Sequence, residues 1–164
     1  MKNVLLIVTV LFIGLTACSQ GAPKSPKVTL ENSAVKVVYG QPSKRDRVVF
    51  GGLVPYGQVW RAGANNATEI TFTKDGSFGG QAIKAGTYSL FVNPTEKDWT
   101  IILNSELKQW GSFGYDKIKD KDVLKVTVPV KKLGAVVEAL TYRFDGNKLI
   151  IEWEQTQAEV TLSF

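Results

Sequence analysis

The side chains best suited to binding chemistry lie between residues 39 and 68, where aromatic, guanidinium and amide groups stand among many glycines. An arginine offers a planar fork for a carboxylate, a phosphate or sugar hydroxyls, and a tryptophan or tyrosine offers a stacking face. This combination is typical of a preformed pocket or a rigid ligand-facing loop. The candidate ligand-binding residues of this stretch are Arg47, Tyr56, Trp60, Arg61, Asn65, Asn66 and Thr68.

The same residues also suit a purely structural role. Arg61 and its neighbouring amides can tie a long loop to the body of the domain, with Trp60 filling the core. The charged run at residues 45–47 favours a solvated, salt-bridged turn, and entry of Arg47 into the site is the alternative. The sequence leaves both interpretations open.

A second group of aromatic candidates lies in a glycine-bearing loop at residues 110–116. We expect Trp110 and Tyr115 to contribute the rim of a site. Trp99 and Trp153, by contrast, stand in phase with apolar neighbours at period two, which predicts two core residues.

The composition excludes several familiar reaction chemistries. The chain has no histidine and a single cysteine, Cys18. Zinc sites built from histidine and cysteine are therefore excluded, as are Ser-His-Asp and Cys-His catalysis. Hydrolysis by two carboxylates about 5 to 10 Å apart stays possible, and Glu138 is the acid that we expect to point inward.

These considerations favour a non-enzymatic binding module for a small molecule, a glycan or a protein, with no catalytic residue, metal or cofactor assigned. The alternatives are a carboxylate-based hydrolase acting on cell-envelope glycan and a structural envelope protein. The formal net charge of +5 is modest and the basic residues are interleaved with acidic ones. We therefore expect no nucleic-acid partner, which would require a clustered basic face.

The first eighteen residues predict where the protein resides. An apolar segment at residues 4–15 follows Lys2 and ends in Leu-Thr-Ala before Cys18, which is typical of a signal peptide and too short to span a membrane. The pattern resembles a bacterial lipoprotein signal, so we expect cleavage after residue 17 and lipidation of Cys18. Because serine follows Cys18, sorting rules favour the outer membrane, facing the periplasm.

The remainder divides into a tether and one domain. Residues 18–27 contain two prolines and a glycine among polar residues, which favours a flexible tether to the membrane. Residues 28–164 alternate apolar and polar side chains in short runs, and Asp145-Gly146 is a strong hairpin signal. We expect an all-β, antiparallel two-sheet sandwich, jelly-roll-like, with about nine or ten strands. Residues 104–110 and 130–137 could each form a helical turn.

Several motifs together resemble a known family. They are the glycine-rich run at 51–57, the stretches 60–65 and 67–68, and the later segments 85–91, 99–102 and 110–111. In this order they are similar to the bacterial domain-of-unknown-function family 2911, over essentially all of residues 28–164. The resemblance implies an envelope or secreted protein of Bacteroidetes-like bacteria, often a lipoprotein, and it carries no established activity.

Overall fold

The computed structural model describes residues 25–164. The predicted signal peptide, Cys18 and the tether residues before Ser25 lie outside the described residues. Within residues 25–164, no helix has the length and apolar character needed to cross a membrane. The strands are β1 (Lys27–Glu31), β2 (Val35–Gly40), β3 (Thr68–Phe72), β4 (Gly76–Phe78), β5 (Gln81–Ile83), β6 (Gly86–Pro94), β7 (Asp98–Asn104), β8 (Asp122–Asp145) and β9 (Lys148–Ser163), with 3-10 turns at Tyr115–Lys117 and Lys119–Lys121.

The predicted all-β, antiparallel class is confirmed. Every pairing between named strands is antiparallel, and the nine strands follow the order β1-β2-β3-β6-β7-β8-β9-β4-β5. This order is continuous, so the expected division into two separate sheets is not confirmed. The first strand already includes Lys27, which the sequence analysis assigned to the tether.

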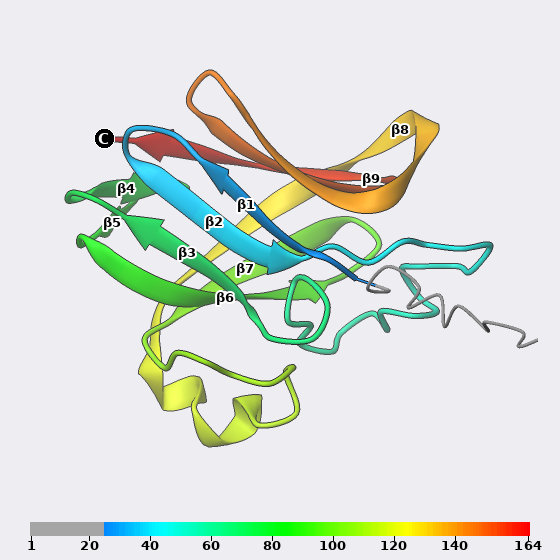
Figure 1. Ribbon diagram of the computed structural model, residues 1–164, viewed down its shortest axis with the longest axis horizontal. Helices are drawn as coiled ribbons and strands as arrows, with labels where there is room; N and C mark the ends of the chain where they lie inside the picture. Colours follow the sequence, from blue (N-terminus) through cyan, green and yellow to red (C-terminus); the bar gives the residue numbers. More distant parts are fainter. Residues whose placement is uncertain (1–24) are drawn as a thin grey trace, which may run out of the picture.

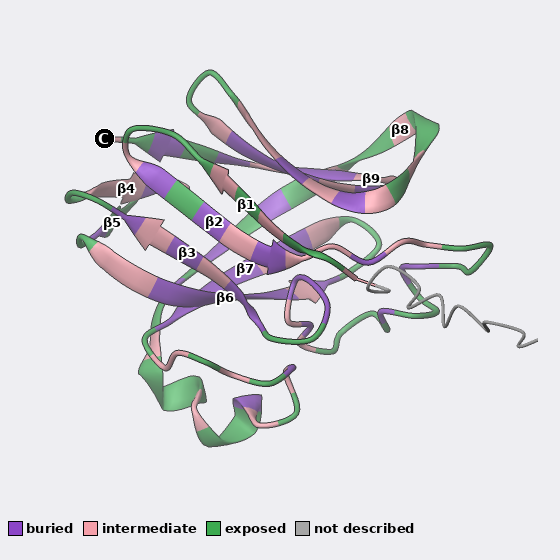
Figure 2. Ribbon diagram, in the orientation of Figure 1, coloured by how far each residue is buried: buried purple, intermediate pink, exposed green. Residues whose placement is uncertain are grey.

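The single sheet wraps so that one face encloses the core (Figure 1). Phe72 of β3 and Phe78 of β4 are far apart in the strand order, yet their ring centroids lie 6.0 Å apart. Burial alternates along β2, as period-two side chains require, and Figure 2 shows this alternation. Trp99 and Trp153 are fully buried, as predicted.

The long strands β8 and β9 bend to produce this wrapping. A straight strand of 24 residues would span about 80 Å, which is far longer than a small domain. The register of the β8–β9 pair is interrupted between Lys132 and Thr141, and Glu154 of β9 has a φ of +56°. The Leu162 amide accordingly donates to the Asn147 carbonyl at 2.7 Å, which brings the end of β9 back to its start.

Three sequence predictions concern β8 and the hairpin that follows it, and their outcomes differ. The Asp145-Gly146 hairpin is confirmed, because Asp145 pairs with Lys148 and Gly146 has a positive φ. The helical turn expected at residues 130–137 is wrong, since these residues belong to β8. Glu138 does not point inward; it is exposed, and its carboxylate accepts a hydrogen bond from the Arg45 amide at 2.9 Å.

The return of β9 assembles an ion cluster around Glu159. Lys131 donates to its carboxylate at 2.6 Å and Lys148 donates to it at 2.9 Å. These two hydrogen bonds lower the pKa of Glu159 from 4.5 to about 2, and the bond from Lys131 makes the larger contribution. A depressed folded-state pKa contributes stability above the unfolded value and loses it as the pH falls toward the folded value.

We therefore predict that Glu159→Gln is less stable than wild type at neutral pH, and that this difference shrinks as the pH falls from 4.5 toward 2. Urea unfolding midpoints at neutral pH and at about pH 3 measure this difference in stability. Glu31→Gln is the control, because Glu31 is an exposed acid whose ion pair with Lys36 is long, 3.8 Å. A Glu159→Gln deficit that is equal at both pH values would contradict the prediction.

Candidate functional site

Two cavities lie side by side at the end of the domain where β1 begins. We call the first, of about 410 Å³, the Trp110 cavity, and the second, of about 430 Å³, the Arg61 cavity. Ser25, Ala64 and Asn65 line both of them. The loop between β2 and β3 contributes to both walls and lies at this end of the domain (Figure 1).

The wall shared by the two cavities is held by a rigid loop. Ala62 is fully buried with a φ of +53°, a conformation that costs roughly 1–2 kcal/mol for a residue with a Cβ. Two hydroxyl groups secure it, since Thr68 Oγ1 and Tyr142 Oη donate to the Ala62 carbonyl at 2.9 and 2.7 Å. Thr68 is itself fully buried. Its role is therefore to fix the loop, and it lines neither cavity.

Trp60 anchors the same loop in the core. It is 8% exposed, its indole N–H donates to the Gly63 carbonyl at 3.2 Å, and its ring stacks on Trp153 with centroids 5.8 Å apart. Both tryptophans also contribute to the lining of the Arg61 cavity. Trp60 is thus a core residue whose edge forms part of the cavity wall.

Arg61 is the most unusual side chain of the site. It is partly buried, and its Nε atom is buried without a hydrogen-bond partner among residues 25–164. Burial lowers the pKa of this guanidinium, because a low-dielectric surrounding disfavours the charged form. The residues that line the Arg61 cavity include no acid, and Arg47 is the other cation among them. The cavity therefore presents positive charge that no carboxylate of its wall balances.

Arg47 is held by its own turn. Arg45 and Asp46 both have positive φ, and the Arg47 guanidinium donates to the carbonyls of Ser43 at 2.8 Å and Lys44 at 2.9 Å. The residue is exposed and contributes to the lining of the Arg61 cavity. Arg47 thus belongs to a surface turn and also lines the cavity, two roles that were predicted as alternatives from the sequence.

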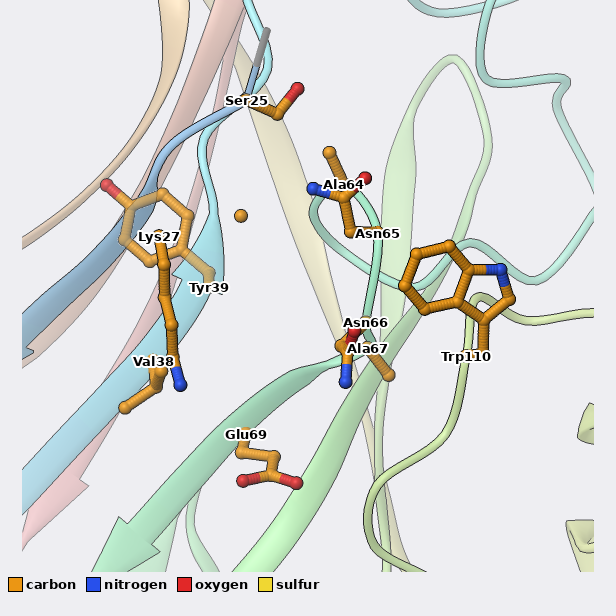
Figure 3. A pocket seen from close by; sticks show the side chains of 11 residues that line it. Ser25, Lys27, Val38, Tyr39, Ala64, Asn65, Asn66, Ala67, Glu69 and Trp110 are labelled. Carbon is orange, nitrogen blue, oxygen red and sulfur yellow. The ribbon is translucent and has the colours of Figure 1, made fainter. Parts of the chain in front are cut away.

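A second loop, after β7, completes the Trp110 cavity. The Gly111 amide donates to the Asn65 carbonyl at 3.0 Å, and Asn66 forms an isolated bridge with Trp110. Trp110 is 68% exposed, and its indole stands across the cavity from Tyr39 and beside Asn65 and Asn66 (Figure 3). Within residues 25–164, the side-chain amides of Asn65 and Asn66 form no hydrogen bond, and both residues are exposed.

Two predicted residues lie elsewhere. Tyr56 is 40% exposed and lines neither cavity. Tyr115 does not form a rim: it is buried against Phe91, with ring centroids 5.2 Å apart, and its hydroxyl donates to Asp122 at 2.5 Å. Burial and this carboxylate raise the pKa of Tyr115 well above its ordinary range.

Other residues that line the cavities were not predicted from the sequence. Phe113 is 86% exposed at the Arg61 cavity, and Lys27 and Glu69 line the Trp110 cavity. Phe113 lies in the same glycine-bearing loop as Trp110, and this position could have identified it as a candidate. Lys27 and Glu69 carried none, because each reads as an ordinary solvated position of a strand.

The acids are not paired at either cavity. Glu69 is the one carboxylate that lines the Trp110 cavity, and the Arg61 cavity has none. Among residues 25–164, no three side chains of the histidine, cysteine, aspartate and glutamate types gather as candidate metal ligands.

Fold and site together define an all-β domain with two adjoining cavities at one end, one cationic and one lined by amides and an indole. The profile of a family described as "Protein of unknown function (DUF2911)" matches residues 22–162. The chain therefore belongs to this family, as the motif resemblance implied. No curated protein and no solved structure matches the chain significantly.

Proposed function

We propose that this protein is a lipid-anchored envelope protein that binds a small organic anion in the Arg61 cavity without transforming it. The observation that carries the proposal is the partly buried Arg61 guanidinium, with an unpartnered Nε, in a cavity whose wall contains no acid. A buried donor without a partner costs about 1–3 kcal/mol, more for a charged group. A bound carboxylate or phosphate balances the charge of this guanidinium by accepting charge-assisted hydrogen bonds from its terminal nitrogens.

The rest of the lining suits a ligand with a ring. The edges of Trp60 and Trp153 and the exposed Phe113 supply apolar surface, and Asn65 supplies an amide for hydroxyl groups. A sugar acid or a sugar phosphate combines all of these features. The carboxylate-based hydrolase is the weaker alternative, because neither cavity offers the two acids that such a reaction needs.

The envelope location is part of the proposal and is supported by the sequence of residues 1–18. Acyl chains on Cys18 would hold the chain at a membrane, for which the outer membrane facing the periplasm is our choice. Ser25 follows Cys18 by seven positions, and a chain extends by at most about 3.6 Å per residue, so the cavities would lie within roughly 25 Å of the anchor.

The test is Arg61→Met, with D-glucuronate and glucose 1-phosphate as the probes in isothermal titration at low salt. Wild type is expected to bind at least one probe, and the variant to bind it about 10- to 100-fold more weakly, the loss of one charge-assisted contact. The variant's melting temperature should equal or exceed that of wild type, because methionine removes the unpartnered buried N–H.

Arg45→Met is the matched control. It removes the same charge from an exposed residue of the neighbouring turn that lines neither cavity. It should leave the affinity within about twofold, since an exposed charge acts weakly over distance. Failure of wild type to bind either probe at millimolar concentration, or equal weakening by both variants, would overturn the proposal.

A further inference from the structure

The Trp110 cavity differs in chemistry from its neighbour, and the proposed function does not use it. Its lining has one cation, Lys27, and one carboxylate, Glu69, so its charges are balanced. Glu69 is already engaged, because it accepts a hydrogen bond from the Lys108 amide at 3.2 Å. A second anion would gain nothing here, and a neutral polar group fits better.

The polar and aromatic groups of this cavity suit one face of a neutral sugar. The Trp110 indole offers an exposed apolar surface, and the amides of Asn65 and Asn66 supply both donors and acceptors for hydroxyl groups (Figure 3). Tyr39 lies across the cavity from the indole.

The backbone that carries the indole is also positioned in advance. The Asn66–Trp110 bridge, the Gly111–Asn65 hydrogen bond of 3.0 Å and the Ala67–Gln109 hydrogen bond of 2.9 Å tie its loop to the wall shared by both cavities. A platform that is already ordered loses little entropy when a ligand binds. An exposed tryptophan held in this way is poorly explained by stability alone, because its side chain is 68% exposed.

The two cavities adjoin through Ser25, Ala64 and Asn65, which line both. We infer that the ligand is an acidic oligosaccharide that spans them, with its acidic sugar at Arg61 and a neighbouring neutral sugar at Trp110. This inference rests on the proposed function and names its ligand class. Asn65 stands where the two sugars are joined and contacts both.

The test compares three probes by isothermal titration: D-glucuronate, aldotriouronic acid (a glucuronate attached to a xylose disaccharide) and neutral xylotriose. Wild type is expected to bind the acidic trisaccharide about three- to tenfold more tightly than glucuronate, which is the effect of one added aromatic contact. Xylotriose should bind more weakly than the acidic trisaccharide, because it leaves Arg61 without an anion.

Trp110→Ala separates the inference from the proposed function. It should abolish the advantage of the trisaccharide and leave glucuronate affinity unchanged, because Trp110 does not line the Arg61 cavity. Tyr56→Ala, which removes an exposed aromatic ring outside both cavities, is the control and should preserve the advantage.

Each contrary result has a distinct meaning. Glucuronate binding with no trisaccharide advantage, or an advantage that survives Trp110→Ala, would overturn the inference and leave the proposed function intact. Xylotriose binding as tight as that of the acidic trisaccharide would also overturn it, since the two cavities would then not share one ligand. Failure of wild type to bind both D-glucuronate and glucose 1-phosphate would remove the proposed function itself.

Discussion

Replacing Gly40 with alanine is expected to destabilise the domain and displace the loop that carries Arg61 and Asn65. The Ala64 amide donates to the Gly40 carbonyl at 3.1 Å, so the two backbones are in direct contact. A Cβ at position 40 would overlap the Ala64 carbonyl group, which is backbone and cannot rotate away. Gly40 has no positive φ, and this close approach alone requires glycine there.

Overpacking of this kind costs about 1–3 kcal/mol or more, which corresponds to a fall in melting temperature of roughly 3–12 °C. Differential scanning calorimetry measures it. Binding of D-glucuronate should weaken as well, because the displaced loop forms a wall of the Arg61 cavity. The Gly40→Ala substitution is thus expected to lower both the melting temperature and the affinity for D-glucuronate.

Gly134→Ala is the matched control for this prediction. Gly134 lies in β8, has no positive φ, and a Cβ there would meet no atom within 4 Å. The substitution should be neutral or stabilise the domain by up to about 1 kcal/mol, because alanine restricts the unfolded chain. Equal melting temperatures for the two variants would show that the Gly40–Ala64 contact has no energetic role.

The strands were predictable because their signal is local. Period-two burial along β2 and the aspartate–glycine turn between β8 and β9 both follow from neighbouring residues. The bend of β8 and β9 was not predictable, because it depends on contacts such as that between Leu162 and Asn147, which no local pattern encodes. Glu138 is in phase with the buried Leu140 and Tyr142, but it lies where the β8–β9 register is interrupted, and there it is exposed.

The site was predictable in part for a similar reason. The stretch that contains Arg61 and Asn65 was identified by composition, and both residues do lie at the cavities. The contact of this stretch with Trp110 was not predictable, because it depends on a bridge between Asn66 and Trp110, which are 44 positions apart in the chain. The prediction that Tyr115 forms a rim was wrong because its ring packs against Phe91 in the interior. The sequence of a glycine-bearing loop does not indicate such a long-range contact.

The second large effect concerns the anchor: Cys18→Ser is expected to abolish all incorporation of an alkyne-tagged palmitate analogue into the protein. Cys18 is the only thiol of the chain, so no other residue can replace it as a thioether-linked lipid site. Each buried CH₂ contributes about 0.8 kcal/mol, and one acyl chain holds a protein only marginally, whereas two or three hold it stably. Gel fluorescence after labelling measures the result.

Labelling is a sharper measurement here than membrane fractionation. A variant that keeps its apolar residues 4–15 uncleaved could stay at the membrane without any lipid, so its location would not report on Cys18. Ser19→Ala is the control, because it changes the adjacent hydroxyl and retains the thiol. Label in the Cys18→Ser variant, or none in wild type, would refute the anchor. The cavities would then lose their link to the bilayer, while the Arg61 test would stand unchanged.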